Sequence, residues 1–276
     1  APAFDRLIFL FTNEDATLSA AHAGQVDIAS IPPALAANVP GHMQRVIMES
    51  VDNRGILFPM QPANGEHAAS GAPIGNDVTA DLAIRQAINL AVDRQTLVEV
   101  ALHGYGRPAY GPADGLSWSS EEERIEAPDM TRAEALLDAA GWQRGDDGLR
   151  YKDGLPARFR LTYPSSDTTR QLLAEVSAEM VRPLGIEMQP TGRHWDEIQR
   201  EALHQDAIMF GFGSHSPQEV YYLFHSQHAG NGFYNSGFYA NAEVDTHLDA
   251  AQASESVETA NQYWRAAQWD GTTGYG

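Results

Sequence analysis

Three short apolar segments, separated by helical patterns, constrain the fold of this chain more than any other feature. Residues 159–163 alternate apolar and polar side chains with a period of two, as a strand does, and residues 186–188 and 207–210 continue the series. The intervening residues 168–180 and 195–203 carry apolar side chains at helical spacing. Strand–helix–strand units of this kind favour a mainly parallel or mixed sheet with helices on its faces.

The first thirty residues predict another strand–helix–strand unit. Residues 7–11 are continuously apolar, which is typical of a strand covered on both faces. A short helix is expected over 16–23, with Gly24 as a left-handed cap, and a short buried strand over 26–29.

Capping residues mark several further helices. Residues 80–102 are strongly helical, and Asp93 is placed to cap a second turn within them. Thr131 and Glu134 have the spacing of a capping box, so we expect a helix to start at Thr131. Caps are also expected at Asn241 and Ser256.

Composition excludes several classes of function. The chain has 18 basic and 37 acidic residues, a formal net charge of -19, so we expect it to repel nucleic acids and anionic membranes. It has no cysteine, which excludes disulfides, thiolate metal sites and cysteine nucleophiles. Its one lysine, Lys152, follows no phosphate-loop glycine pattern. No apolar run approaches the roughly 20 residues that span a bilayer, so we expect a soluble protein.

Three stretches carry a family resemblance. They are 21–28 (AHAGQVDI), 84–94 (IRQAINLAVDR) running into 103–109 (HGYGRPA), and 135–142 (ALLDAAGW). Their order and intervals resemble the family 5 extracellular solute-binding proteins, which bind peptides, nickel chelates and similar solutes. The resemblance implies an α/β, two-lobed periplasmic-binding-protein-like fold (type II, class C). Mixed sheets with flanking helices are expected, with lobe I incomplete in this chain.

The resemblance also implies a division of the chain. Residues 1–78 correspond to part of lobe I and the interlobe connection, 79–255 to lobe II, and 256–276 to a helix returning toward lobe I. Members of the family are nearly twice as long, and residues 1–4 lack the basic and apolar regions of a signal peptide. We therefore expect the leader and the rest of lobe I to lie outside this chain.

The loop after the strand 207–210 is the strongest candidate for a ligand contact. Ser216 suits the N-cap of a following helix, with Pro217 in the first helical position and Glu219 completing a capping box. Glycines let the backbone approach a ligand, and free amides at the turn suit a carboxylate. The candidate ligand-binding residues in this loop are Gly213, Ser214, His215 and Ser216.

The alternative is an ordinary strand-to-helix turn. The resemblance adds a distinction, because the peptide binders of the family carry an acidic residue in this loop. Ser214 or His215 stands there in this chain, which disfavours free-amine peptides and favours a metal chelate, an opine-like molecule or a blocked peptide.

Three further residues are candidates for ligand contact. Arg193 lies at a strand-to-helix turn, and Tyr234 and Asn235 belong to an aromatic, glycine-rich stretch that suits either a solute cleft or a loop packed over the core. His215 with His225 and His228 could form a direct metal site, but scattered surface histidines are the alternative, and no metal ligands are assigned.

The resemblance implies the extracytoplasmic, periplasmic solute-binding component of an ABC importer. Such a protein captures a peptide or related organic solute between its lobes by hinge motion and delivers it to a membrane permease and ATPase. Alternatives are a binder of nickel or another metal chelate, and a peptide-sensing or chaperone-like module. Ser214 beside His215 lacks the Gly-x-Ser-x-Gly context of a nucleophile, so we expect no catalytic residues. We also expect a monomer without cofactors.

Overall fold

A four-stranded mixed sheet lies at the centre of the computed structural model, which describes residues 4–122 and 124–275. The sheet has the order β1-β7-β5-β6; β5 runs parallel to both neighbours, and β1 is antiparallel to β7. The mixed pairing expected from the strand–helix–strand order is therefore confirmed. The strands are β1 Gly55–Leu57, β5 Arg158–Pro164, β6 Glu187–Arg193 and β7 Ala207–Phe210.

The two helical connections also lie where the sequence predicts them. α5 (Thr168–Val181) joins β5 to β6 and packs on both strands. The second connection consists of the single turn α6 (Trp195–Glu197) followed by the π-helical turn η4 (Ile198–Ala202). The carboxyl ends of β5, β6 and β7 therefore meet at one edge of the sheet.

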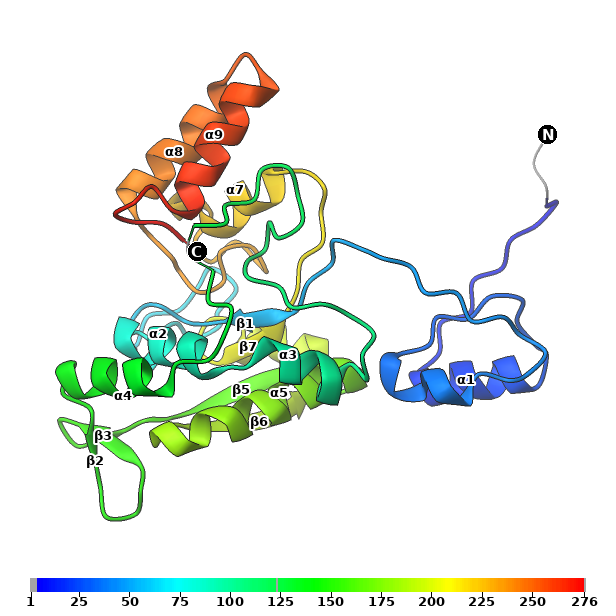
Figure 1. Ribbon diagram of the computed structural model, residues 1–276, viewed down its shortest axis with the longest axis horizontal. Helices are drawn as coiled ribbons and strands as arrows, with labels where there is room; N and C mark the ends of the chain where they lie inside the picture. Colours follow the sequence, from blue (N-terminus) through cyan, green and yellow to red (C-terminus); the bar gives the residue numbers. More distant parts are fainter. Residues whose placement is uncertain (1–3, 123, 276) are drawn as a thin grey trace.

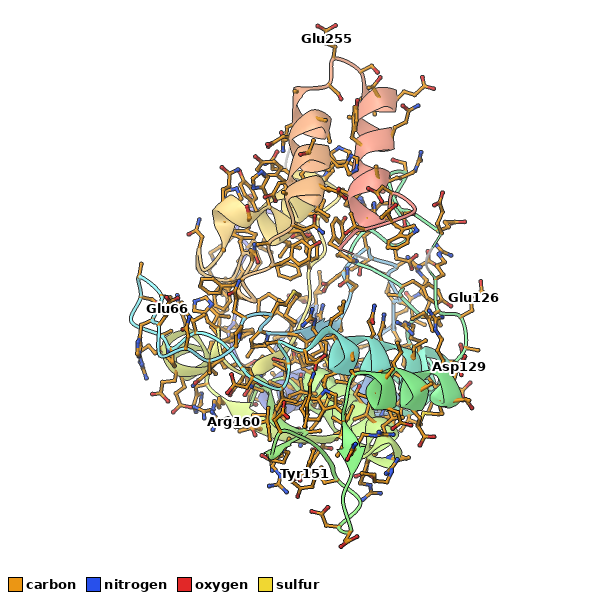
Figure 2. The ribbon with its side chains drawn as sticks, turned by 90° about the vertical axis from the view of Figure 1, so that its left-hand side faces the viewer. Glu66, Glu126, Asp129, Tyr151, Arg160 and Glu255 are labelled. Carbon is orange, nitrogen blue, oxygen red and sulfur yellow. The ribbon has the colours of Figure 1, made fainter. Side chains whose placement is uncertain are left out.

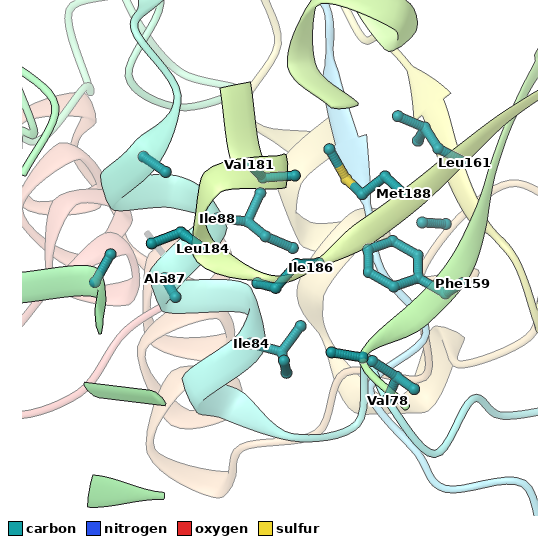
Figure 3. Close-up of a cluster of buried hydrophobic side chains, with 14 of the residues drawn as sticks. Val78, Ile84, Ala87, Ile88, Phe159, Leu161, Val181, Leu184, Ile186 and Met188 are labelled. Carbon is teal, nitrogen blue, oxygen red and sulfur yellow. The ribbon is translucent and has the colours of Figure 1, made fainter. Parts of the chain in front are cut away.

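The predicted helix 80–102 is divided into α2 (Leu82–Ala91), α3 (Arg94–Thr96) and the π-helical turn η2 (Leu97–Ala101). The division occurs because Asp93, in extended conformation, accepts hydrogen bonds from the amides of Gln95 and Thr96 and starts a new helix, as expected. Figure 3 shows the core that results, with side chains of α2 facing those of β5 and the segment before β6. Its members include Ile84, Ile88, Phe159, Leu161 and Ile186.

A second helical group lies above the sheet layer in Figure 1. It contains α7 (Gln218–Phe224), η5 (Ser226–His228), α8 (Ala242–Ala253) and α9 (Val257–Gln268). The α8–α9 hairpin projects from the body, and its apolar cluster also includes Val220 of α7 and Ala113 and Trp118 of the segment that follows η2. Asn241 and Ser256 cap these two helices through their side chains, as the sequence predicts.

A small antiparallel sheet lies at the opposite end. Figure 2 shows Tyr151 in this sheet and Glu255 at the tip of the α8–α9 hairpin, far apart. Its strands are β2 Gln143–Arg144, β3 Arg150–Lys152 and β4 Leu155–Pro156. No helix within residues 4–122 and 124–275 combines the length and apolarity needed to cross a membrane.

The start of α4 (Met130–Ala139) corrects one prediction. Its N-cap is Asp129, which accepts from the amide of Arg132, so the predicted capping box at Thr131 is wrong. Glu134 instead pairs with Arg144 at 3.1 Å. The aspartate two positions earlier offers the same cap with a charged acceptor, and it prevails over the threonine.

The amino-terminal region corrects two more predictions. α1 (Glu14–His22) and the left-handed Gly24 are confirmed, and η1 (Pro33–Asn38) follows. However, residues 7–11 and 26–29 do not form strands; the apolar side chains of 7–11 are exposed, from 59% at Leu10 to 95% at Phe11, and Ile28 is 88% exposed. A strand needs a neighbour for its amides and carbonyls, and these segments have none within the described residues.

We predict that the amino-terminal region is the first part of the isolated chain to be cut by a protease. In the described residues 4–50 the buried hydrophobic side chains are only Ala21 and Ala36, so local opening there costs little. Limited chymotrypsin digestion followed by mass spectrometry should find the first cuts within 4–50, leaving the segment from β1 to α9 intact. A first cut within β5 or β7 would contradict this expectation.

Asp81 joins α2 to the small sheet. One carboxylate oxygen caps α2 by accepting from the amide of Ala83 at 2.9 Å. The other accepts from the indole nitrogen of Trp142 at 3.0 Å and from the ammonium of Lys152 at 2.7 Å. Burial opposes ionisation of Asp81, but the hydrogen bonds from Lys152, Ala83 and Trp142 outweigh it and lower the pKa of the carboxyl below its ordinary value of 3.8.

We predict that Asp81→Ala lowers the free energy of unfolding by about 2 kcal/mol, because it removes a helix cap and leaves the buried indole N–H of Trp142 without an acceptor. Asp146→Ala, at an exposed acid near the same sheet, is the matched control and should change little. The folded pKa of Asp81 is depressed, so its contribution is complete above pH 3.8 and is lost as the pH falls below that value. Urea titrations of both variants across this range measure the effect; an undiminished difference in acid would contradict the assignment.

Candidate solute-binding site

The loop after β7 lies directly against a segment far away in sequence. The antiparallel register of β1 and β7 continues past the strand ends, so that residues 52–54 lie opposite 211–213, and the amide of Asn53 donates to the carbonyl of Phe212 at 2.9 Å. A Cβ on Gly211 would lie 2.1 Å from the carbonyl oxygen of Asn53, and one on Gly213 would lie 2.7 Å from the Cα of Asp52. Glycine is required at both positions because the two backbones approach so closely.

The turn itself differs from the predicted capping box. α7 begins at Gln218 with Pro217 as its N-cap, one residue later than predicted. The carboxylate of Glu219 accepts from the amide of Ser214 at 2.9 Å, not from Ser216, and the hydroxyl of Ser214 accepts from the amide of Ser216 at 3.0 Å. Two amides of the turn are therefore already bonded within the loop, and the carboxylate of Glu219 lies beside them.

An aromatic cluster covers the carboxyl ends of β6 and β7. We use this name for Trp195, Phe210, Phe212 and Phe233. The rings of Phe210 and Phe233 stack with centroids 5.5 Å apart, and Trp195 meets both edge-on at 5.7 and 5.6 Å. Phe212 lies 4.9 Å from Phe210. Trp195 is 37% exposed, so a large apolar ring faces solvent at this edge.

Two arginines lie at the same edge. Arg193 ends β6 and donates to the carboxylate of Glu201 at 3.2 Å. Arg170, in the first turn of α5, pairs with Asp167 and lies over the ring of Trp195 at 5.9 Å. Each guanidinium group has five N–H donors, and one carboxylate does not use them all. The edge thus combines an exposed aromatic ring with directed hydrogen-bond donors.

Tyr234 and Asn235 have different surroundings. Tyr234 is 41% exposed and lies 5.3 Å from the ring of Tyr222. Asn235 is 4% exposed with a φ of 39°, and its side-chain amide donates to the carbonyls of His225 and Tyr239 at 3.1 and 2.9 Å. The side chain of Asn235 therefore fixes the shape of the loop, and Tyr234 is the neighbour that reaches solvent.

The histidines do not converge on an ion. His225 and His228 lie with ring centroids 6.2 Å apart, and the Nε2 atom of His225 is 3.2 Å from a carboxylate oxygen of Asp249. Burial, followed by the proximity of His225, lowers the pKa of His228 below its ordinary value. His215 is exposed in the loop before α7. The described part of the chain has no group of three or more His, Cys, Asp or Glu side chains arranged to hold a metal.

Comparison with known proteins decides the family. The model of the bacterial extracellular solute-binding proteins, family 5 (middle), matches residues 1–234. Protein XP55 of Streptomyces lividans is 37% identical over 248 residues, which cover 89% of this chain and 43% of that protein. The chain belongs to the family 5 extracellular solute-binding proteins.

Two other relatives agree with this assignment. The oligopeptide-binding protein AppA of Bacillus subtilis is 29% identical over 198 residues, 68% of this chain and 36% of that protein. The crystal structure of NikZ from Campylobacter jejuni in complex with Ni(L-His) matches with a TM-score of 0.80 at 24% identity. The match covers 92% of this chain and 50% of that one, and it shows that the two share a fold over this region. This family 5 chain thus spans at most half the length of these relatives.

The structure brings together some predicted residues and adds others. Gly213, Ser214, His215 and Ser216 lie in one loop, and Arg193 ends the strand two places away in the same sheet. Arg170 and the segment 52–54, which lies against the loop, were not predicted from the sequence. The two glycines at 211 and 213, on one side of an extended segment, were the available signal of a close backbone approach.

We predict that Gly211→Ala lowers the free energy of unfolding by about 1–3 kcal/mol, because the added methyl group meets the backbone carbonyl of Asn53, which cannot move aside as the nearby side chain of Arg54 can. Gly41→Ala is the matched control, since a Cβ there meets nothing within 4 Å and its backbone is not left-handed. Chemical denaturation of the two variants tests this. Equal stabilities would show that segment 52–54 moves aside without cost.

Proposed function

We propose that this chain is the principal solute-contacting part of an extracytoplasmic, periplasmic binding component of an ABC importer. In this proposal a small organic solute or peptide lies at the carboxyl edge of the sheet, between lobe II (79–255) and lobe I (1–78 together with the rest of the protein). Hinge closure presents the loaded protein to a membrane permease and its ATPase. The names of the relatives, oligopeptide-binding AppA and NikZ with Ni(L-His), support this class of function.

The observation that carries the proposal is the convergence of the aromatic cluster, Arg193 and the loop 211–217 at the carboxyl edge. Ligands of open α/β sheets bind outside the carboxyl ends of the strands. Aromatic rings supply apolar contact at low entropic cost, and the guanidinium donors orient a polar group. Binding, and not catalysis, is what this arrangement offers.

The turn amides contribute less than the sequence suggests. Ser214 and Ser216 already have hydrogen-bond partners, and the carboxylates of Glu219 and Asp52 lie beside the loop. The carboxylate of Asp52 is paired with Arg54 at 2.6 Å, but the carboxylate of Glu219 would repel a solute carboxylate at this turn. We therefore assign the main recognition to Trp195 and Arg193, with the loop 213–216 and Tyr234 shaping the cleft around the solute.

We predict that Trp195→Ala weakens solute binding by about tenfold or more, as expected for a central aromatic contact. Tyr263→Ala on α9 is the matched control, because Tyr263 is 38% exposed against 37% for Trp195 but lies away from the carboxyl edge. Native mass spectrometry of the full-length secreted protein identifies the bound solute, and calorimetry with that solute compares the variants. Equal affinities in both variants would remove the aromatic cluster from the site.

A metal chelate is the second candidate, favoured by the likeness to NikZ and by the exposed position of His215 in the loop. One histidine can complete the coordination of a metal that brings its own ligands. The same spectrum distinguishes the two candidates when the protein is purified without a metal column. A transition-metal isotope pattern that His215→Ala removes supports the chelate, whereas an organic mass without metal supports the peptide or organic solute.

A further inference from the structure

The sequence contains two Asn-Gly pairs, at 64–65 and 231–232. In such a pair the backbone nitrogen of the glycine can attack the side-chain amide of the asparagine, because glycine has no side chain to hinder the approach. Asn64 and Asn231 are both exposed. Exposure therefore does not distinguish the two pairs, and the hydrogen bonds around each of them do.

Asn64 lies in the loop that joins β1 to α2, and Figure 2 labels Glu66 of this loop at the outer edge of the molecule. The Oδ1 atom of Asn64 accepts a hydrogen bond from the amide of Glu66 at 2.9 Å. A turn of this kind folds the asparagine side chain back along its own backbone. The side-chain carbonyl carbon is thereby brought toward the nitrogen of the next residue, Gly65.

The nitrogen of Gly65 is free to act as the nucleophile. Among residues 4–122 and 124–275, no protein acceptor takes a hydrogen bond from its N–H group. The backbone of Gly65 is left-handed, with a φ of 81°, and nothing lies within 4 Å of the position that a Cβ would occupy. An exposed amide without a protein acceptor exchanges its proton readily with solvent. The proton that must leave before the attack is therefore accessible to solvent base.

The second pair has different surroundings. The amide of Gly232 donates to the carbonyl of Gly230 at 3.1 Å, so the nitrogen that would attack is already engaged. The amide of Asn231 donates to the carbonyl of His228 at 3.0 Å, and its carbonyl accepts from the amide of Tyr234 at 3.3 Å. Within the described part of the chain, no amide donates to the side chain of Asn231. This pair is therefore held by its backbone and lacks the contact that Glu66 gives to Asn64.

We propose that Asn64 is a site of spontaneous modification, at which the side-chain amide is converted to a carboxylate through a cyclic succinimide formed with Gly65. Solvent hydroxide removes the proton of the Gly65 amide, and the nitrogen forms a bond to Cγ of Asn64. The Cγ–Nδ2 bond then breaks, and Nδ2 takes a proton from water and leaves as ammonia. Water opens the succinimide at either carbonyl, which gives aspartate or isoaspartate. The negative charge of the intermediate develops on Oδ1, where the Glu66 amide stabilises it.

The product alters the connection between β1 and α2. Aspartate at position 64 adds a negative charge two positions from Glu66. Isoaspartate instead adds a methylene group to the backbone, directly before a hairpin in which the amide of Ile74 donates to the carbonyl of Glu66 at 3.0 Å and the amide of Ala68 donates to the carbonyl of Ala72 at 2.8 Å. Chains of different age therefore differ in charge and in backbone length at this loop.

Incubation of the full-length protein in mildly alkaline heavy-oxygen water tests the proposal, because opening of the succinimide places heavy oxygen in the new carboxylate. Peptide mapping by mass spectrometry then measures the rate at each Asn-Gly pair. In the folded protein we expect residue 64 to react about tenfold or more faster than residue 231, since only Asn64 has both a free nucleophile and a donor at Oδ1. In urea both turns are lost, and the two rates should agree within about threefold.

Two variants test the role of the Glu66 amide. Glu66→Pro removes this N–H group and should slow the reaction at residue 64 about tenfold, whereas Glu66→Gln keeps it and should change the rate by less than about threefold. Circular dichroism shows that both variants are folded, and in urea both should react like the wild type. Equal rates at 64 and 231 in the folded protein, a preference for 64 that persists in urea, or an unchanged rate in Glu66→Pro overturns the proposal. None of these results depends on solute binding at the carboxyl edge.

Discussion

Parallel pairing of β5 with both β6 and β7 is the constraint on which the candidate site depends. Because the three strands run in one direction, their carboxyl ends lie at one edge, and the connections α5 and α6–η4 must each return from that edge to the opposite one. Arg193 and Trp195 follow the end of β6, and the parallel pairing places Phe210, at the end of β7, at the same edge. The core against which β5 packs stabilises this pairing, and Leu161 of β5 is fully buried in it.

The local pattern of the sequence predicted the elements that carry their own signals. β7 and α5 lie where apolar periodicity placed them, and Asn241, Ser256 and Asp93 cap the helices expected of them. The choice between two possible N-caps could not be predicted from the sequence. Asp129 and Thr131 both suit an N-cap, and only the structure shows that Asp129 caps the helix. The prediction of a strand over residues 7–11 was wrong for a different reason. An apolar run states that a segment is to be covered, but not by what, and the described residues supply no partner strand.

The sequence predicted only part of the candidate site, because local patterns do not show which distant segment lies against a loop. The sequence located the loop at 213–216, because glycines and a helix start are local signals. It could not show that Asp52 lies opposite Gly213, since this contact joins residues 161 positions apart through a register that only the folded sheet defines. The consequence is electrostatic. A turn whose sequence suggests a carboxylate site has the carboxylate of Glu219 and the Asp52–Arg54 pair as neighbours in the fold. For this reason we propose the aromatic ring and the arginine across the edge as the main solute contacts.

Buried polar groups hold the surface loop beside this edge in one shape. His204 is 2% exposed and donates from Nδ1 to the carbonyl of Ser236 at 2.9 Å. Burial lowers the pKa of its imidazole, and the hydrogen bond to Ser236 only partly opposes this, so His204 stays neutral near pH 7. Together with the three hydrogen bonds of Asn235, this anchor fixes the backbone that follows Tyr234. A ring presented on a fixed loop loses little entropy when a solute packs against it, which is the condition for tight binding by a small contact area.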